Sequence, residues 1–168
     1  TILRAKNPVS IPFITMTLDV MKSFGAHISM TKDGSDLVFT IAGDGYKQTE
    51  YFVEPDIMSA SYFFAAAAIT GHPVFVPGLS TSTIQGDIAF ADAIERMGAV
   101  VQRGDDYLET HGVRGQGGLQ GITIDCTAIP DAAMTLAVMA LFAKGKTRLE
   151  NIASWRVKET DRIAAMAT

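Results

Sequence analysis

The sequence predicts an α/β (α+β) fold built from repeated units, each with the element order strand, helix, strand, helix, strand, strand (βαβαββ). The first observation behind this prediction is an internal repeat. Residues 19–28 match 92–101, and 54–71 match 129–145, each pair about 74 residues apart. Because the two matches lie in different parts of the unit and share nearly one offset, a chance resemblance between helices explains them less well. The second observation is that apolar residues recur with helical spacing in some stretches and alternate as in strands in others.

The elements of the unit follow from local patterns. A Pro-Asp pair, at 55–56 and again at 130–131, opens an alanine-rich helix in each copy. The second helix of the unit ends at Gly98 and carries an apolar stripe at i, i+3 spacing, formed by Ile88, Ala91, Ile94 and Met97. Alternating stretches on either side of short polar turns predict hairpins within 27–43 and 100–111.

Laid out in this way, the chain contains the later part of one unit (residues 1 to about 48), one full unit (about 49 to 121) and the opening of a third (122 to 168). The glycine-rich stretch 112–121 is expected to be a hairpin end, because a strand follows it where a phosphate-binding loop would lead into a helix. Since the pattern stops inside a unit, we expect the chain to be an internal piece of a larger protein.

Composition limits the function. The 168 residues are 48% hydrophobic and carry a net charge of −4, the wrong sign for a generic nucleic-acid or acidic-membrane binder. The apolar runs 59–69 and 132–143 have about a dozen residues, whereas a membrane-spanning helix needs roughly 20, so they are interpreted as buried helices. Cys126 is the only cysteine, so no intramolecular disulfide forms, and it is interpreted as a small core residue. With scattered histidines and no export signal, we expect a cytoplasmic protein without a metal site.

Charged residues gather in one stretch, "SWRVKETDRI" at 154–163. If a helix begins near Val157, the side chains of Lys158, Glu159 and Arg162 lie on one face of it. Lys158 and Arg162 are then like charges one turn apart, an arrangement that a bound anion would stabilise. The helix start adds unpaired N–H donors and a partial positive charge, which favour the same anion. Arg162 is suited to bind a carboxylate or phosphate, and Glu159 to transfer a proton. The alternative is a solvated helix face on which Glu159 simply pairs with Arg162.

The internal repeat favours the functional interpretation of this stretch. At the positions of Glu159, Thr160 and Arg162 the preceding copy is uncharged, with Gln85, Gly86 and Ile88. The scaffold therefore does not require the charges, which suggests a site added to it.

Asp131 has two interpretations. An Asp in the first turn of a helix is standard helix-start chemistry, and Asp56 is expected to do the same in the preceding copy. The functional alternative is a carboxylate that faces the same cleft as Lys158 and Glu159. Trp155 likewise has two interpretations, a lid over the helix start or a core residue.

Five stretches in order resemble the bacterial 5-enolpyruvylshikimate-3-phosphate synthase (3-phosphoshikimate 1-carboxyvinyltransferase) family: 7–25, 51–69, 85–99, 129–145 and 155–163. The resemblance covers essentially the whole chain, and "RVKETDR" is its most specific part. It corresponds to an internal section of the enzyme, a little under half. It implies a fold of two lobes, each made of three βαβαββ units with helices packed inside small mixed sheets. Residues 1–53 would belong to one lobe, as the later part of a unit, and 54–168 to the other.

The resemblance also implies a reaction of the shikimate pathway, in aromatic amino-acid biosynthesis. The enolpyruvyl group of phosphoenolpyruvate moves to the 5-hydroxyl of shikimate 3-phosphate, with phosphate released. By resemblance, Glu159 and Lys158 are candidates for proton transfer, Arg162 for binding phosphoenolpyruvate, and Asp131 for the carboxylate near the reacting hydroxyl. Ser10 matches a contact to shikimate 3-phosphate. No cofactor or metal is implied, and the full-length enzyme is expected to be monomeric.

Two positions depart from the family pattern. Phe13 stands where close relatives carry Tyr, and Ser154 where some carry Asn, so both substrate contacts change. Because other substrate-binding segments of the family lie outside this chain, the fragment alone is expected to be inactive. Two alternatives remain at this point: a UDP-N-acetylglucosamine enolpyruvyl transferase, and a repeat-built module that binds a protein partner without catalysis.

Overall fold

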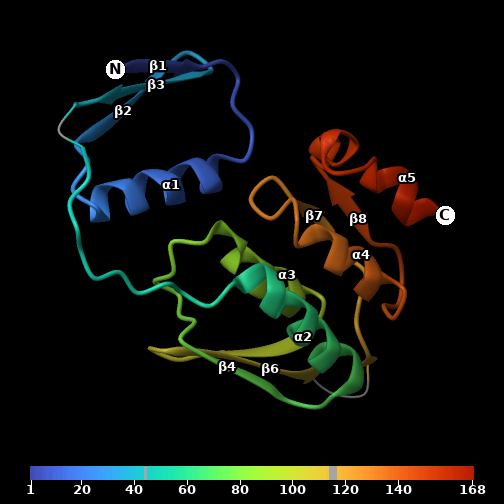
Figure 1. The fold of residues 1–168 in the computed structure, drawn as a ribbon. Coiled ribbons are helices and arrows are strands. Elements are labelled where there is room, and N and C mark those ends of the chain that lie inside the picture. The colour runs from blue at the N-terminus through green and yellow to red at the C-terminus, as the bar shows by residue number, and fades with distance from the viewer. Residues whose placement is uncertain (44, 114–116) are drawn as a thin grey trace. The chain divides into compact units, whose positions relative to one another are not determined.

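The computed structural model describes residues 1–43, 45–113 and 117–168 (Figure 1). The chain divides into two compact units, residues 1–53 and 54–168. Their assignment to the two lobes of a larger enzyme stays a prediction. Part of the predicted glycine-rich hairpin end, residues 114–116, lies outside the described residues. In the described part, no helix is both long and apolar enough to cross a membrane.

The first unit is a three-stranded sheet with one helix. Its elements are β1 (Ile2–Ala5), α1 (Ile11–Ser23), β2 (Ile28–Asp33) and β3 (Asp36–Ile41). All pairs are antiparallel in the order β1-β3-β2, and β2 with β3 forms the first predicted hairpin. Gly25, with φ of +83°, ends α1 in a backbone conformation that L side chains rarely adopt. Leu18 of α1 and Leu37 and Phe39 of β3 form the small core.

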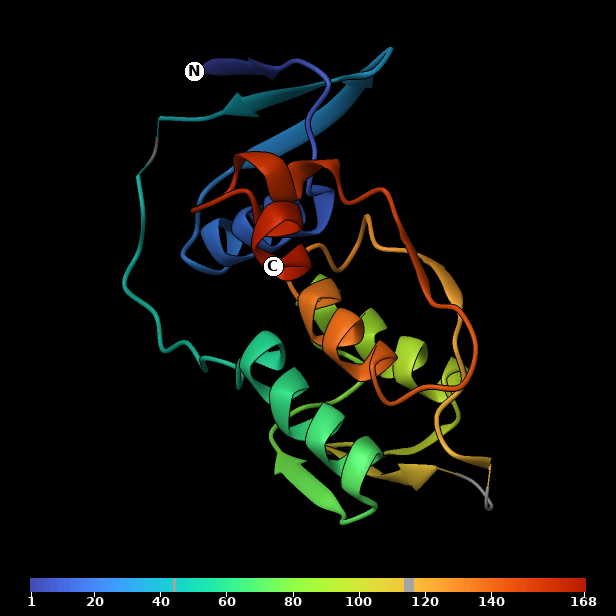
Figure 2. The same cartoon turned by 90° about the vertical axis from the view of Figure 1, so that its right-hand side faces the viewer.

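The second unit repeats this pattern with an additional leading helix. Its first copy consists of α2 (Ile57–Thr70), β4 (Val74–Pro77), the 3₁₀ turn η1 (Gly86–Ile88), α3 (Ala89–Arg96), β5 (Ala99–Arg103) and β6 (Tyr107–Val113). The antiparallel order β4-β6-β5 matches β1-β3-β2 of the first unit, so the repeat predicted from the sequence is confirmed in three dimensions. Helices α2 and α3 cover one face of this sheet (Figures 1 and 2).

The opening of a third copy follows within the second unit. It comprises β7 (Thr123–Asp125), α4 (Ala133–Ala140), β8 (Arg148–Glu150), the 3₁₀ turn η3 (Ala153–Val157) and α5 (Arg162–Ala167). β7 and β8 pair in parallel. Helix α4 pairs with α2 through repeat-equivalent residues, since the hydroxyls of Ser61 and Thr135 lie 3.1 Å apart in the core.

One predicted element is wrong. The unit pattern placed an opening strand near residues 49–53, but no described residue between 45 and 56 forms a strand. These residues link the two units, and the side chains of Phe52 and Val53 are exposed. A strand needs a neighbouring strand to satisfy its backbone hydrogen bonds, and no described strand pairs with this segment.

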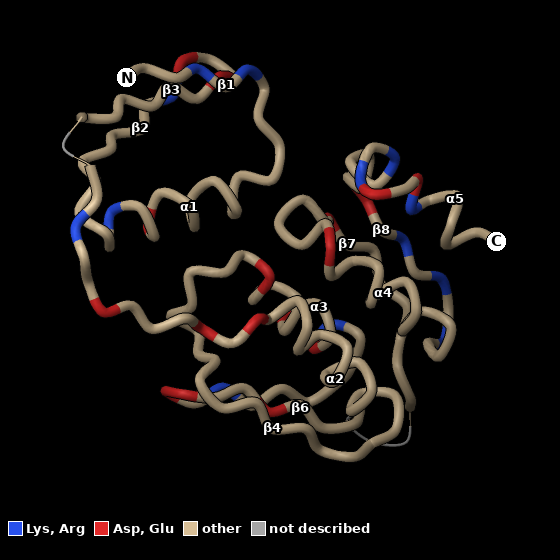
Figure 3. Tube along the Cα trace, viewed as in Figure 1, with Lys and Arg blue, Asp and Glu red and all other residues tan. Residues whose placement is uncertain are grey.

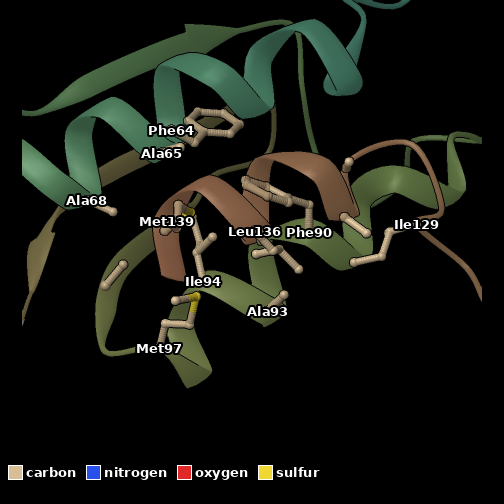
Figure 4. Packing of buried hydrophobic residues seen from close by; sticks show 14 of the residues in the cluster. Phe64, Ala65, Ala68, Phe90, Ala93, Ile94, Met97, Ile129, Leu136 and Met139 are labelled. Carbon is tan, nitrogen blue, oxygen red and sulfur yellow. The ribbon is translucent and has the colours of Figure 1, made fainter. Parts of the chain in front are cut away.

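The core of the second unit lies where α2, α3 and α4 meet (Figure 4). Phe64 from α2, Ile94 from α3 and Leu136 from α4 are almost fully buried there. Each such side chain stabilises the fold by about 1.5–3 kcal/mol relative to an exposed one. Cys126 is buried in the same cluster, as predicted, and burial followed by the charge of Asp125 raises the pKa of its thiol to about 11. The beginnings of α2 and α4 are thereby held in fixed positions.

Candidate active site

The aspartates of the two Pro-Asp pairs have different hydrogen-bond partners. Asp56 is the N-cap of α2, where its carboxylate accepts hydrogen bonds from the backbone N–H groups of Met58 and Ser59 at 3.1 and 3.2 Å. Asp131 lies two residues before α4, and no side-chain cap is formed at the start of that helix. For Asp131 the capping interpretation is therefore wrong. Its carboxylate is available for partners outside α4.

The charged stretch starts its helix later than predicted. Residues 153–157 form the turn η3, the backbone of Lys158 is not helical, and α5 begins only at Arg162. Asp161 fixes that start, because its carboxylate accepts a hydrogen bond from the N–H of Ala164 at 3.1 Å. Lys158 and Glu159 are thus on the segment before the helix, and the prediction that they share a helix face with Arg162 is wrong.

Even so, the charged side chains converge. The Arg162 guanidinium donates hydrogen bonds to Asp131 through Nη1 and to Glu159 Oε2 through Nη2 and Nε, the latter two at 2.6 and 3.1 Å. The ammonium of Lys158 lies 3.4 Å from the same Asp131 oxygen. Figure 3 shows basic and acidic residues close together in the stretch that leads into α5. We call Asp131, Lys158, Glu159 and Arg162 the charged cluster.

Burial differs across the cluster. The side chains of Arg162 and Asp131 are only 12% and 16% exposed, whereas that of Glu159 is 75% exposed. Burial works against the charge of Arg162, but its hydrogen bonds to Asp131 and Glu159 outweigh this and raise the pKa of the guanidinium. The pKa of the Glu159 carboxyl is lowered, first by its own backbone N–H and then by Arg162. Glu159 is therefore ionised at neutral pH, as a proton acceptor must be, and its side chain is also exposed.

Trp155 is a core residue. It is 2% exposed, and its indole Nε1–H donates to the carbonyl oxygen of Pro130 at 2.5 Å. In the preceding copy the equivalent carbonyl, that of Pro55, accepts instead from Gln85 Nε2 at 2.8 Å. Gln85 aligns with Glu159, but in this copy the hydrogen bond to the proline carbonyl comes from Trp155. This leaves Glu159 free to face the cations.

The cluster borders an apolar cavity of about 480 Å³ between α2, α4 and α5. Asp131 and Arg162 are its charged lining residues, and the rest of the lining is mainly apolar, including Met58, Tyr62, Ile69, Met134, Val138 and Met166. An apolar cavity does not suit a polyanionic substrate. Only its charged edge fits a ligand that carries phosphate or carboxylate groups.

The other predicted site residues are not in this cluster. Ser154 is a half-buried residue of η3. Ser10 and Phe13 belong to the first unit, where Ser10 precedes α1 with a positive φ of 57° and its hydroxyl does not cap the helix. A non-glycine residue with such a backbone is uncommon and often marks a functional position.

One charged residue beside the cluster was missed by the sequence interpretation. Asp87 is only 5% exposed, and the charges of Asp131, Asp56 and Lys158 all act on it. The repeat aligns Asp87 with Asp161, but no pattern in the sequence indicates that one is buried and the other is at the surface.

The repeated strand order, β1-β3-β2 and β4-β6-β5, and the likeness to the solved structures reported below give the chain the α/β fold of the enolpyruvyl transferases. The family model for EPSP synthase (3-phosphoshikimate 1-carboxyvinyltransferase) matches residues 2–168, and the chain belongs to this family.

Relatives and solved structures agree with this assignment. The chain is 56% identical over 162 residues to 3-phosphoshikimate 1-carboxyvinyltransferase of Cupriavidus taiwanensis, covering 95% of this chain and 37% of that protein. The Cupriavidus necator enzyme of the same name is 55% identical over the same shares. EPSP synthase from Acinetobacter baumannii superposes with a TM-score of 0.65 at 29% identity, over 90% of this chain and 35% of that one. The enolpyruvyl transferase NikO from Streptomyces tendae shares the fold, with a TM-score of 0.65 at 20% identity over 88% of this chain and 35% of that one. The chain thus spans about 37% of the length of the curated relatives.

Proposed function

We propose that this chain forms part of an enzyme that transfers the enolpyruvyl group of phosphoenolpyruvate to the 5-hydroxyl of shikimate 3-phosphate. The observation that carries the proposal is the convergence of Lys158, Glu159 and Arg162 around Asp131 in a chain of this family. Two cations and two carboxylates in one place supply what an addition–elimination reaction of anionic substrates needs.

In the addition step, the 5-hydroxyl oxygen attacks C2 of the enolpyruvyl group and a proton is delivered to the methylene carbon, which becomes a methyl group. In the elimination step, phosphate leaves C2 and the methyl group gives up a proton, which regenerates the enol ether. Glu159 and Lys158 are the candidates for these proton transfers, and Asp131 is the carboxylate that would orient the reacting hydroxyl. No organic cofactor or metal enters the scheme.

Arg162 would bind phosphoenolpyruvate. Its guanidinium is neutralised by Asp131 and Glu159 in this structure, so an incoming phosphate or carboxylate must compete with those partners. Exchange of partners has a useful consequence, because it would release Asp131 toward the hydroxyl and Glu159 toward the transferable proton as the substrate binds.

Ser10, Phe13 and Ser154 complete the proposed substrate contacts. The hydroxyls of Ser10 and Ser154 can hydrogen-bond an anionic, hydroxylated ligand, whereas Phe13 offers only its ring. A cytoplasmic location and a monomeric full-length enzyme are also part of the proposal. The single cysteine supports the first, and sedimentation of the full-length protein tests the second.

The test is phosphate release by the purified full-length protein with phosphoenolpyruvate and shikimate 3-phosphate. We expect release with both substrates together and none from residues 1–168 alone. Glu159→Gln should cut turnover by about two orders of magnitude or more. The control is Glu150→Gln, a carboxylate of β8 that pairs with Arg148 away from the cluster. Near-normal turnover of Glu159→Gln would remove Glu159 from the mechanism.

Two alternative functions predict different results in these assays. Phosphate release with UDP-N-acetylglucosamine in place of shikimate 3-phosphate would identify the other enolpyruvyl transferase, which the family match disfavours. A non-catalytic module that binds a protein partner predicts no turnover and no thermal stabilisation by shikimate 3-phosphate.

A further inference from the structure

Asp87 is a buried carboxylate that the proposed reaction does not use. It lies in η1, the turn that leads into α3, and is 5% exposed. Among the residues that the structure describes, its Oδ1 atom is buried without a hydrogen-bond partner. Buried polar atoms are nearly always hydrogen-bonded in native proteins, so an orphan carboxylate oxygen requires an explanation.

Contacts near Asp87 tie it to the two helix starts. Gln85, two residues earlier, accepts a hydrogen bond from the N–H of Ile57 at 2.9 Å at the start of α2. The start of α4 is held to α2 one turn further on by Ser61 and Thr135. Consistent with this position, the charges of Asp131, Asp56 and Lys158 act on the Asp87 carboxyl. Asp87 is thus a third carboxylate in the region of the two helix starts, and it is more buried than Asp131.

Of the cations in the charged cluster, Lys158 is the one whose charge acts on Asp87. Its ammonium has three donors, and the 3.4 Å contact to Asp131 is the longest in the cluster. Arg162, by contrast, is held by Asp131 and Glu159 together. The ammonium of Lys158 therefore has donors beyond its contact with Asp131, while Oδ1 of Asp87 lacks a donor; no ion pair joins the two among the residues that the structure describes.

The repeat shows that an orphan carboxylate is not a requirement of the scaffold. Asp161 is the equivalent of Asp87 in the next copy, and it accepts from the N–H of Ala164 and pairs with Arg156 at 2.9 Å. The two equivalent aspartates thus differ, because both carboxylate oxygens of Asp161 have partners, whereas Oδ1 of Asp87 has none in the described part of the chain.

We propose that Asp87 is a positioning residue, which anchors the Lys158 ammonium from the core side while the remaining donors of Lys158 bind substrate. The role rests on the proposed transferase function. In the complex, Arg162 turns to the substrate anion, and Lys158 bridges Asp87 and Asp131. Asp87 touches no substrate atom and acts only through Lys158.

The anchor depends on pH. Burial, followed by the negative charges of Asp131 and Asp56, raises the pKa of Asp87 to about 6, while Lys158 opposes the shift. Above this pH the carboxylate is charged and holds the ammonium. Below this pH the carboxyl group of Asp87 is neutral and holds the Lys158 ammonium only weakly. The groups that face Asp87 are Asp56 from the start of α2, Asp131 before α4 and Lys158 after η3.

The first test compares Asp87→Asn with the wild type in the full-length enzyme at saturating substrates between pH 5 and 8. We expect kcat of the variant to be about tenfold lower at pH 8, because a misplaced proton-transfer group loses rate steeply. Below pH 6 the two rates should converge, since the protonated Asp87 of the wild type is then neutral, as the asparagine of the variant always is. Ionisation of the substrates cancels in the ratio of the two rates. Asp92→Asn, on the exposed side of α3, is the control and should match the wild type at every pH. A ratio that stays at one, or that does not change with pH, overturns the proposal.

The second test needs no turnover, and so separates this inference from the proposed function. Carbon-13 NMR of aspartate carboxyls follows the titration of Asp87 in the full-length wild type and in Lys158→Met. Loss of the positive charge of Lys158 should move the Asp87 midpoint to higher pH. If the midpoint of Asp87 is the same in both proteins, Lys158 is not its partner and the proposal is wrong, even where the transferase is active. If the midpoint moves but no transferase activity is found, only the proposed reaction fails.

Discussion

The two Pro-Asp pairs allow a matched test of which aspartate is structural. Asp56→Ala removes a carboxylate that accepts from Met58 N–H, Ser59 N–H and the Ser59 hydroxyl, the last at 2.5 Å. Loss of an N-cap of this kind costs about 1–2 kcal/mol. An opening free energy lower by 1.4 kcal/mol corresponds to a tenfold change in an equilibrium constant, so amide exchange at Met58 and Ser59 should become about tenfold faster.

Asp131→Ala removes the equivalent side chain from the next copy but no cap, since no side-chain hydrogen bond is formed at the start of α4. Hydrogen–deuterium exchange in the first turn of α4 should therefore stay at the wild-type rate. The expected loss is at Arg162, which keeps only Glu159 as a partner. If exchange in α4 accelerates in Asp131→Ala as much as exchange in α2 does in Asp56→Ala, then Asp131 is a cap and the argument that frees it for chemistry fails.

Three further outcomes follow from named contacts. Trp155→Phe leaves the buried carbonyl of Pro130 without its donor, which should cost about 1–3 kcal/mol in urea denaturation, and near-wild-type stability would contradict the hydrogen bond. Arg162→Lys keeps the charge but not the fork that binds Asp131 and Glu159 together; we expect a raised KM for phosphoenolpyruvate, and an unchanged KM would remove Arg162 from substrate binding. The thiol of Cys126, with a pKa raised to about 11, should react with a thiol reagent at pH 8 only after unfolding, and fast labelling of the native protein would show that it is not buried.

Local patterns were enough to predict most of the repeat. Hairpins follow from alternation and turn residues over a few positions, and the stripe through Ala91, Ile94 and Met97 is buried as its spacing requires. The strand predicted near 49–53 failed because pairing is not a local property. The same type of segment, at β7, pairs in parallel with β8 once that neighbour is at hand.

The members of the charged cluster were predictable from the sequence, but their geometry was not. Charge at positions where the other copy is uncharged pointed to Glu159 and Arg162, the spacing to Arg162 pointed to Lys158, and the Pro-Asp pair pointed to Asp131. The start of α5 was misplaced because Asp161, a good N-cap, lies after the charges. Asp87 could not be predicted, because its burial depends on how α2, α3 and α4 pack. The matching residue of the next copy, Asp161, has a side chain that is 38% exposed.

The copies also show how a scaffold can release a position for chemistry. A proline carbonyl at each helix start needs a donor, supplied by Gln85 in one copy and by Trp155 in the next. Because Trp155 is the donor in the later copy, the position equivalent to Gln85 is not needed for this hydrogen bond, and it is occupied by Glu159. The two copies thus differ at this position by a structural amide in one and an exposed carboxylate beside Arg162 in the other.

Asp87 should be a residue whose removal stabilises the protein. Its pKa in the folded state, about 6, is above the usual 3.8, so between these values the folded state binds more protons than the unfolded state and stability falls as pH rises. The difference corresponds to roughly 2–3 kcal/mol at neutral pH. Asp87→Asn keeps the shape without the charge, and should therefore unfold at higher urea than the wild type at pH 7.5 and at a similar concentration near pH 4. The control, Asp92→Asn, should show no such gain. If Asp87→Asn is no more stable than the wild type at pH 7.5, the buried charge of Asp87 does not destabilise the fold. The stability argument for Asp87 as an anchor of Lys158 is then wrong. A gain in stability together with lower kcat would mean that the protein tolerates a costly buried carboxylate because the reaction needs it.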